Sequence, residues 1–183
     1  KAIREKTFFE NPVLTTAVRR AREKDGALHI LGLLSDGGVH SHIDHLKAII
    51  DLAASENLDR VFVHCFLDGR DVPPRCAEKY IADLEKYMAE KEVGKIATVS
   101  GRYYAMDRDK RWDRVQKAYD AITSGTGEFS SSALQAVRSA YDRDENDEFV
   151  LPTVIAYEAE HISQEDGVTE TEDTEIGLLH ACT

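Results

Sequence analysis

An α/β fold with a mainly parallel sheet is the architecture that this 183-residue sequence predicts. Short, nearly continuous apolar runs alternate three times with longer stretches whose apolar residues recur at helical spacing, as in strand–helix–strand units. Each of the three apolar runs ends in a loop that contains glycine, aspartate or arginine. Because crossovers in such units are right-handed, we expect a three-layer α/β/α domain with a Rossmann-like central sheet.

The first unit begins with a helix and continues into a strand. Asn11 before Pro12 is a favourable helix start, with a side-chain cap followed by proline at the first helical position, and apolar spacing continues to about Glu23. The run Ala27–Leu34 is almost entirely apolar, which predicts a parallel strand covered on both faces. A second helix is predicted from about Ser41, whose side chain is the expected cap.

Two further units follow the same pattern. Arg60–Leu67 and Lys95–Ser100 predict the second and third strands. A helix follows each strand, the first ending at Gly94 and the second beginning at about Trp112. We expect Trp112 and the tyrosines at helical spacing to pack in the core.

The remainder of the chain predicts one more helix and one more strand. Ser130–Tyr141 has helical spacing, and Phe149–Tyr157 has the composition of a strand with Pro152 at an edge position. One domain is therefore placed over residues 1–157. Residues 158–183 are acidic and poor in apolar side chains, which predicts a mobile C-terminal segment.

Charge is distributed unevenly along the chain. The formal net charge is −11, but 12 of the 34 acidic residues and no Lys or Arg lie between Asp144 and Thr183, so residues 1–143 are close to neutral. This distribution argues against nucleic acid or an anionic membrane as a partner. Three scattered cysteines and no apolar run of about 18 residues predict a soluble, cytoplasmic protein without a disulfide framework.

The candidate site lies in the three loops that follow the predicted strands. Loops at the carboxyl ends of parallel strands converge on one crevice. The candidate ligand-binding side chains are His40, Arg70, Asp71, Arg102 and Arg108. Arginines on both sides of an anion clamp it, and Asp71 is placed to orient or deprotonate a hydroxyl. The set predicts a small phosphorylated acid as ligand, and mutual repulsion of the arginines in the empty site.

The same residues also have a purely structural interpretation. Asp68–Asp71 has the composition of a turn closed by a local salt bridge. Arg102 and Arg108 are equally compatible with two surface arginines on a long loop. The three loops together are stronger evidence for a ligand site than any single motif is.

The sequence also contains residues that a metal site or a serine nucleophile would need. His40, His42 and His45 have spacings at which imidazoles share an ion, but no second ligand cluster with recognisable spacing is found nearby, so no metal site is predicted in this chain. Ser35 has no assignable histidine base and no nucleophile elbow, and is interpreted as a turn residue.

The three loops form long motifs in a recognisable order. They are Leu34-Ser35-Asp36-Gly37-Gly38-Val39-His40-Ser41-His42, Phe66-Leu67-Asp68-Gly69-Arg70-Asp71-Val72-Pro73-Pro74, and Ser100-Gly101-Arg102-Tyr103-Tyr104-Ala105-Met106-Asp107-Arg108 with Trp112-Asp113-Arg114. Over about Lys1 to Ile155 the chain closely resembles the cofactor-independent (2,3-bisphosphoglycerate-independent) phosphoglycerate mutases.

The resemblance implies an isomerase that interconverts 3-phosphoglycerate and 2-phosphoglycerate in glycolysis and gluconeogenesis. In that family a phosphatase-like domain carries two Mn²⁺ ions and a transiently phosphorylated serine, while a phosphotransferase domain holds the glycerate. Residues 1–157 resemble most of the phosphotransferase domain, so an incomplete substrate-binding domain without its own cofactor is expected. By the family pattern Asp71 is the catalytic base, and the substrate contacts are His40, Arg70, Asp71, Arg102 and Arg108.

Two departures from the family pattern bear on activity. The serine and the Mn²⁺ ligands belong to segments outside Lys1–Thr183, and the family's Arg-x-Asp-Arg motif is not found after Tyr157. The expected protein is a monomer that is inactive by itself, with phosphoglycerate and the missing phosphatase-like domain as partners. A non-catalytic anion-binding module and a self-contained metal hydrolase are the competing hypotheses.

Overall fold

A computed structural model describes residues 1–157, and the acidic segment 158–183 lies outside the described residues. Five strands form one sheet in the order β1-β2-β3-β5-β4. The strands are β1 (Leu28–Leu34), β2 (Val61–Leu67), β3 (Lys95–Gly101), β4 (Glu128–Ser130) and β5 (Thr153–Ile155). The helices are α1 (Pro12–Glu23), α2 (Ile43–Ser55), α3 (Ala77–Lys91), α4 (Arg102–Ala105), α5 (Trp112–Thr123) and α6 (Ala133–Asp142), with 3₁₀ turns η1 (Thr7–Glu10) and η2 (Asp147–Phe149).

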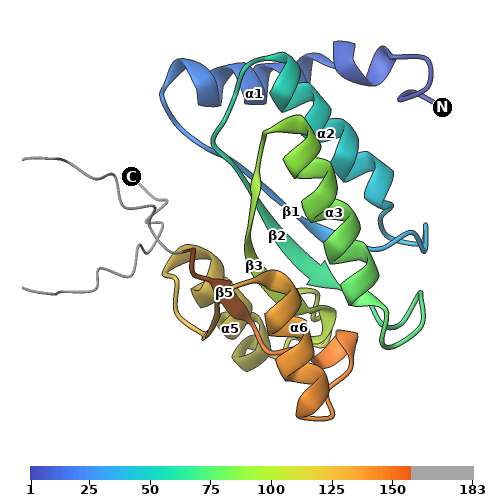
Figure 1. The fold of residues 1–183 in the computed structure, drawn as a ribbon, viewed down its shortest axis with the longest axis vertical. Coiled ribbons are helices and arrows are strands. Elements are labelled where there is room, and N and C mark those ends of the chain that lie inside the picture. Colours follow the sequence, from blue (N-terminus) through green and yellow to red (C-terminus); the bar gives the residue numbers. More distant parts are fainter. Residues whose placement is uncertain (158–183) are drawn as a thin grey trace, which may run out of the picture.

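The sheet is mainly parallel, as the sequence predicts. β1, β2 and β3 pair in parallel, β5 runs antiparallel to β3, and β4 pairs with β5 in parallel. Helices α2 and α3 lie against the three parallel strands, and α6 packs beside α3 (Figure 1). One apolar core joins these helices to the sheet, and its fully buried members include Ile50, Leu67, Ile81, Val99 and Val137.

Local signals set two of the helix starts, with one correction. The Asn11 side chain accepts hydrogen bonds from the N–H groups of Val13 and Leu14, as predicted for the cap of α1. The cap of α2 is His42, whose Nδ1 accepts from the Asp44 N–H at 3.2 Å, and not Ser41. An imidazole nitrogen can accept a hydrogen bond from a free N–H at the helix start just as a hydroxyl can, so His42 caps the helix in place of Ser41.

Two expectations about strand burial were wrong. β1 is an edge strand whose middle is exposed at Leu31 and Gly32, so it is not covered on both faces. Pro152 precedes β5, and β5 lies inside the sheet between β3 and β4. Proline is tolerated there because it sits just before the strand, where only its carbonyl is used, accepting from the Glu128 N–H at 3.1 Å.

The single tryptophan also departs from expectation. Trp112 is 71% exposed, and Tyr119 on the same helix is exposed as well, whereas Tyr80 on α3 is buried as predicted. Helix α5 buries its alanines, Ala118 and Ala121, and packs near β3 and β5 through these small side chains. Trp112 and Tyr119 are therefore left exposed, while Val115 and Ile122 of the same stripe are half-buried. None of the helices in the described part of the chain is long and apolar enough to cross a membrane.

Candidate anion-binding site

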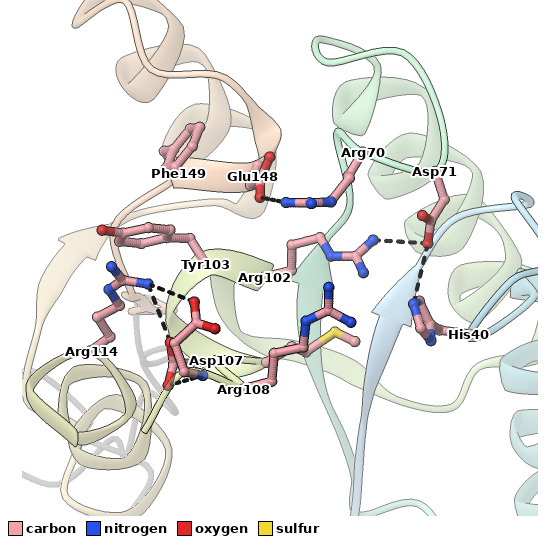
Figure 2. Close-up of a pocket in the computed structure, with 12 residues that line it drawn as sticks. His40, Arg70, Asp71, Arg102, Tyr103, Asp107, Arg108, Arg114, Glu148 and Phe149 are labelled. Atoms are coloured by element: carbon pink, nitrogen blue, oxygen red, sulfur yellow. Dashed lines mark hydrogen bonds and ion pairs between the residues drawn. The ribbon is translucent and has the colours of Figure 1, made fainter. Parts of the chain in front are cut away.

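All five predicted site residues line one cleft. The cleft has a volume of about 620 Å³ and lies beyond the ends of β2 and β3, as parallel-sheet topology predicts (Figure 2). Its lining residues are His40, Arg70, Asp71, Arg102, Tyr103, Met106, Asp107, Arg108, Asp109, Arg114, Glu148 and Phe149. The expected convergence of the three loops is confirmed, whereas the functions of the residues stay predictions.

Asp68 lies at the centre of the site and binds groups from all three loops. It follows the last residue of β2, is buried, and accepts hydrogen bonds from the Ser35 hydroxyl at 2.7 Å and from the N–H groups of Arg70 and Asp71 at 3.2 and 2.9 Å. Burial by itself raises the pKa of Asp68, but the hydrogen bonds, first that of Ser35, offset this and hold the pKa below its usual value. Ser35 is thereby the turn residue that the sequence predicted.

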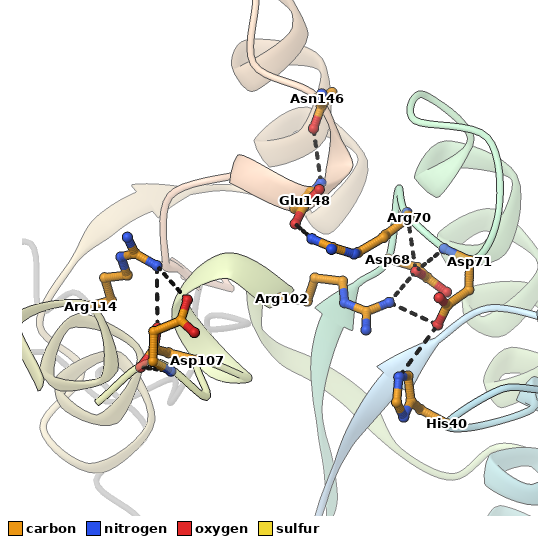
Figure 3. A network of polar contacts seen from close by, with 10 residues as sticks. His40, Asp68, Arg70, Asp71, Arg102, Asp107, Arg114, Asn146 and Glu148 are labelled. Atoms are coloured by element: carbon orange, nitrogen blue, oxygen red, sulfur yellow. Dashed lines mark hydrogen bonds and ion pairs between the residues drawn. The ribbon is translucent and has the colours of Figure 1, made fainter. Parts of the chain in front are cut away.

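Arg102 stands between two carboxylates. One terminal nitrogen, Nη1, lies 2.7 Å from Asp68 Oδ1 and 2.8 Å from Asp71 Oδ2, and the side chain is only 11% exposed (Figure 3). On the other side of Asp71, His40 Nε2 lies 3.9 Å from the same Oδ2. Arg102 therefore fixes the Asp71 carboxylate through Oδ2, and no hydrogen bond within residues 1–157 engages the second oxygen, Oδ1.

The first loop is held so that His40 reaches this cluster. The Tyr80 hydroxyl donates to Asp36, and the Ile43 N–H donates to the Ser35 carbonyl at 2.8 Å. A Cβ at Gly37 would lie 3.2 Å from the Asp71 side chain, so the first two loops are in direct contact here.

Arg70 is paired with a residue that the sequence did not suggest. Its Nη1 lies 3.1 Å from Oε1 of Glu148, which belongs to η2 almost eighty residues later (Figure 3). The expected salt bridge inside Asp68–Asp71 is absent, since Asp68 accepts backbone N–H groups and Arg102 instead. Glu148 carries no local sequence signal, because a glutamate in a three-residue turn resembles any solvent-facing glutamate.

The third loop is closed by a buried aspartate. Asp107 accepts from the N–H groups of Asp109 and Arg111 at 3.2 and 2.8 Å, and from Arg114 Nη1 at 3.2 Å. The guanidinium of Arg114 also stacks 3.9 Å from the centre of the Tyr103 ring. Arg114 stands in the Trp112-Asp113-Arg114 motif, which was the available signal, but it was not assigned to the site.

The charges in the cleft are largely matched in pairs. Arg70, Arg102 and Arg114 each have a carboxylate within 3.2 Å, so two of the three arginines whose mutual repulsion was expected in the empty site, Arg70 and Arg102, are already paired with acids. Within residues 1–157, Arg108 has no ion pair or hydrogen-bonded side-chain partner. Arg108 is therefore the cation in this cleft whose charge is most available to an added anion.

The histidines do not form a metal cluster. His42 caps α2 and His45 stands on its first turn, with ring centres 6.0 Å apart, and His40 turns toward Asp71. No group of three or more His, Cys, Asp or Glu side chains is placed to hold a metal ion in the part of the chain that the structure describes.

Comparison with known proteins gives a consistent result. A family model described as "BPG-independent PGAM N-terminus (iPGM_N)" matches residues 1–172. The curated 2,3-bisphosphoglycerate-independent phosphoglycerate mutase of Clostridium tetani is 59% identical over 155 residues, and that of Symbiobacterium thermophilum is 54% identical over 168 residues. These matches cover 85% and 92% of this chain.

The chain spans only 30% and 32% of the length of these two curated relatives. A crystal structure of Leishmania mexicana phosphoglycerate mutase, determined at low cobalt concentration, matches the fold with a TM-score of 0.70 and 28% identity. That match covers 79% of this chain and 31% of the crystallised one. Both comparisons therefore concern a part of a longer protein.

Proposed function

Because this chain belongs to the 2,3-bisphosphoglycerate-independent phosphoglycerate mutases, as part of their N-terminal portion, we propose that its cleft binds the phosphoglycerate whose phosphate is moved between two hydroxyls. The enzyme that contains this chain is then an isomerase of glycolysis, active in the cytoplasm. The observation that carries the proposal is the placement of His40, Arg70, Asp71 and Arg108 around one open cleft.

Each side chain has a role that its geometry permits. Arg108 is free of side-chain partners among the described residues and offers a planar pair of donors to a carboxylate or phosphate. Arg70 uses one terminal nitrogen on Glu148 and keeps its other donors for the ligand. These two residues are proposed as the anion ligands.

Asp71 is proposed to act on a hydroxyl of the glycerate. Arg102 and His40 both lie beside its Oδ2, so its other oxygen is the one that remains to accept the hydroxyl proton. Holding a three-carbon acid by its charges and its hydroxyl at once keeps it oriented while the phosphate is elsewhere. His40 and Arg102 complete the proposed substrate-binding set.

The phosphoryl-transfer groups are proposed to lie in the remainder of the enzyme. Two Mn²⁺ ions and the serine that carries phosphate are assigned to a phosphatase-like domain, since residues 1–157 hold no cluster of metal-ligating side chains. When bound there, the ions supply the electrostatic stabilisation of phosphoryl transfer. This chain's residues then contribute binding and orientation.

The proposal is tested by titrating the purified 183-residue chain with 3-phosphoglycerate and, separately, with glycerate and inorganic phosphate, followed by amide NMR shifts. We expect 3-phosphoglycerate to bind most tightly, with a dissociation constant of about 1 mM, equivalent to about 4 kcal/mol. An enolase-coupled assay with and without Mn²⁺ should show no turnover. Equal affinity for all three compounds would favour a general anion-binding module, and turnover would contradict the division of functions between domains.

A further inference from the structure

The η2 segment is fixed between two loops of the site. The Cβ that any other residue would add at Gly69 would lie 2.8 Å from the Glu148 nitrogen, and at Gly101 it would lie 2.2 Å from the Glu148 carbonyl oxygen. The backbone of Glu148 therefore passes so close to the ends of β2 and β3 that only glycine fits at both positions. The Gly101 N–H also donates to the Val150 carbonyl at 2.8 Å.

The neighbouring Asp147 secures the same segment from the other side. Its buried carboxylate accepts from the N–H groups of Cys76 and Ala77 at 2.9 and 3.0 Å and from the Tyr141 hydroxyl, and its own N–H donates to the Pro74 carbonyl at 2.9 Å. Asp147 thus caps α3, because Cys76, the N-cap residue that precedes the helix, provides no side-chain cap. The backbone that carries Glu148 has little freedom to shift.

The partners of the Arg70–Glu148 pair differ in freedom. The Glu148 side chain is 18% exposed and extends from the fixed η2 segment, whereas the Arg70 side chain is 61% exposed and extends from a loop (Figure 2). A long, exposed arginine loses considerable rotamer freedom when it must meet a ligand in one conformation. Because the Glu148 carboxylate already holds one nitrogen of Arg70, part of this entropy loss occurs before the ligand binds.

We propose that Glu148 is a positioning residue of the anion site, which holds the Arg70 guanidinium in the cleft ready for the ligand. The proposal rests on the proposed function, since it assumes that Arg70 is an anion ligand. The proposal predicts that removing Glu148 weakens anion binding, whereas simple electrostatics predicts that it strengthens it. A carboxylate beside an anion site repels the anion, so its removal would tighten binding if charge alone mattered.

The test measures inorganic phosphate binding by NMR titration of the 183-residue chain at constant ionic strength. Glu148→Ala should weaken phosphate binding about three- to tenfold, the range expected for losing the order of one long side chain. Glu148→Gln keeps an oxygen that accepts from Arg70, so its affinity should lie between those of Glu148→Ala and the unchanged protein. Tighter binding in both variants would overturn the proposal.

Two controls separate positioning from other effects. Glu145→Ala removes the same charge three residues away, where the carboxylate pairs with Arg143 and does not line the cleft, and it should leave phosphate affinity unchanged. In an Arg70→Ala background, Glu148→Ala should have no further effect, because its influence passes through Arg70. If Glu148→Ala weakens phosphate binding as much in the Arg70→Ala background as in the unchanged protein, Glu148 does not act through Arg70.

The same set of variants keeps the two proposals distinguishable. If Arg70→Ala leaves phosphate binding unchanged, the proposed function of the cleft fails. If Arg70→Ala weakens binding and Glu148→Ala does not, the cleft binds the anion and only the positioning inference fails. Thermal unfolding of each variant confirms that the fold persists.

Discussion

The three loops after β1, β2 and β3 and the short segment at η2 build the same cleft by different means. The loops follow from local patterns, because each ends a parallel strand and the sheet brings their residues together. The η2 segment reaches the site only through tertiary contacts, with Gly69, Gly101 and the buried Asp147 as its attachment points. One wall of the binding site is therefore specified by local sequence motifs and the other by close packing between distant segments.

The largest expected effect comes from disturbing the packed wall. Gly101→Ala would place a methyl group 2.2 Å from the Glu148 carbonyl oxygen and 2.7 Å from the Val150 nitrogen. The extended backbone of Gly101 is compatible with alanine, so the whole cost is steric. We expect a loss of about 3 kcal/mol in the free energy of unfolding, measured by urea denaturation.

Gly32→Ala is the matched control for that substitution. Gly32 also lies in a strand, but no atom stands within 4 Å of the position of its Cβ. Its stability should change by less than about 1 kcal/mol, because only the backbone entropy of the unfolded chain is affected. Equal stabilities of the two variants would show that η2 can shift at little cost. The claim that close packing fixes this wall of the site would then be wrong.

The contrast also explains what the sequence could predict. The strand pattern and loop motifs placed His40, Arg70, Asp71, Arg102 and Arg108 together, because strand topology alone fixes where those loops lie. Glu148 and the ion pairs of the arginines were missed, because which carboxylate meets which arginine depends on side-chain packing between distant segments. Trp112 was misplaced for a related reason, since spacing identifies a helical stripe but not which side chains the sheet accepts.

Acidification should destabilise the parallel strands through the buried His64 of β2. Burial, together with the nearby charge of His29, lowers the pKa of His64 from 6.5 to about 4. His64 is hydrogen-bonded across the sheet, at 3.0 Å to both His29 Nδ1 and Thr98 Oγ1. Between about pH 6.5 and pH 4 the unfolded chain therefore binds a proton that the folded chain does not, so stability falls as the pH falls, by up to about 3 kcal/mol.

Comparison with His64→Asn isolates this effect from that of the carboxylates. Asparagine keeps a donor toward Thr98 and cannot titrate, so its stability deficit at pH 7 should shrink by up to about 3 kcal/mol at pH 4. Urea denaturation at several pH values gives both curves. A deficit that stays constant over this range would mean that His64 is not buried in its neutral form.

The most direct test of the central claim, that the cleft binds an anionic ligand through an arginine left free for it, is the phosphoglycerate affinity of Arg108→Ala against Arg111→Ala. Both variants lose one positive charge from the same loop, but Arg111 lies beside Asp113 and does not line the cleft. NMR titration with 3-phosphoglycerate should show binding about tenfold weaker in Arg108→Ala, the loss of one charge-assisted hydrogen bond, and nearly unchanged in Arg111→Ala. Equal affinities in the two variants would contradict the claim.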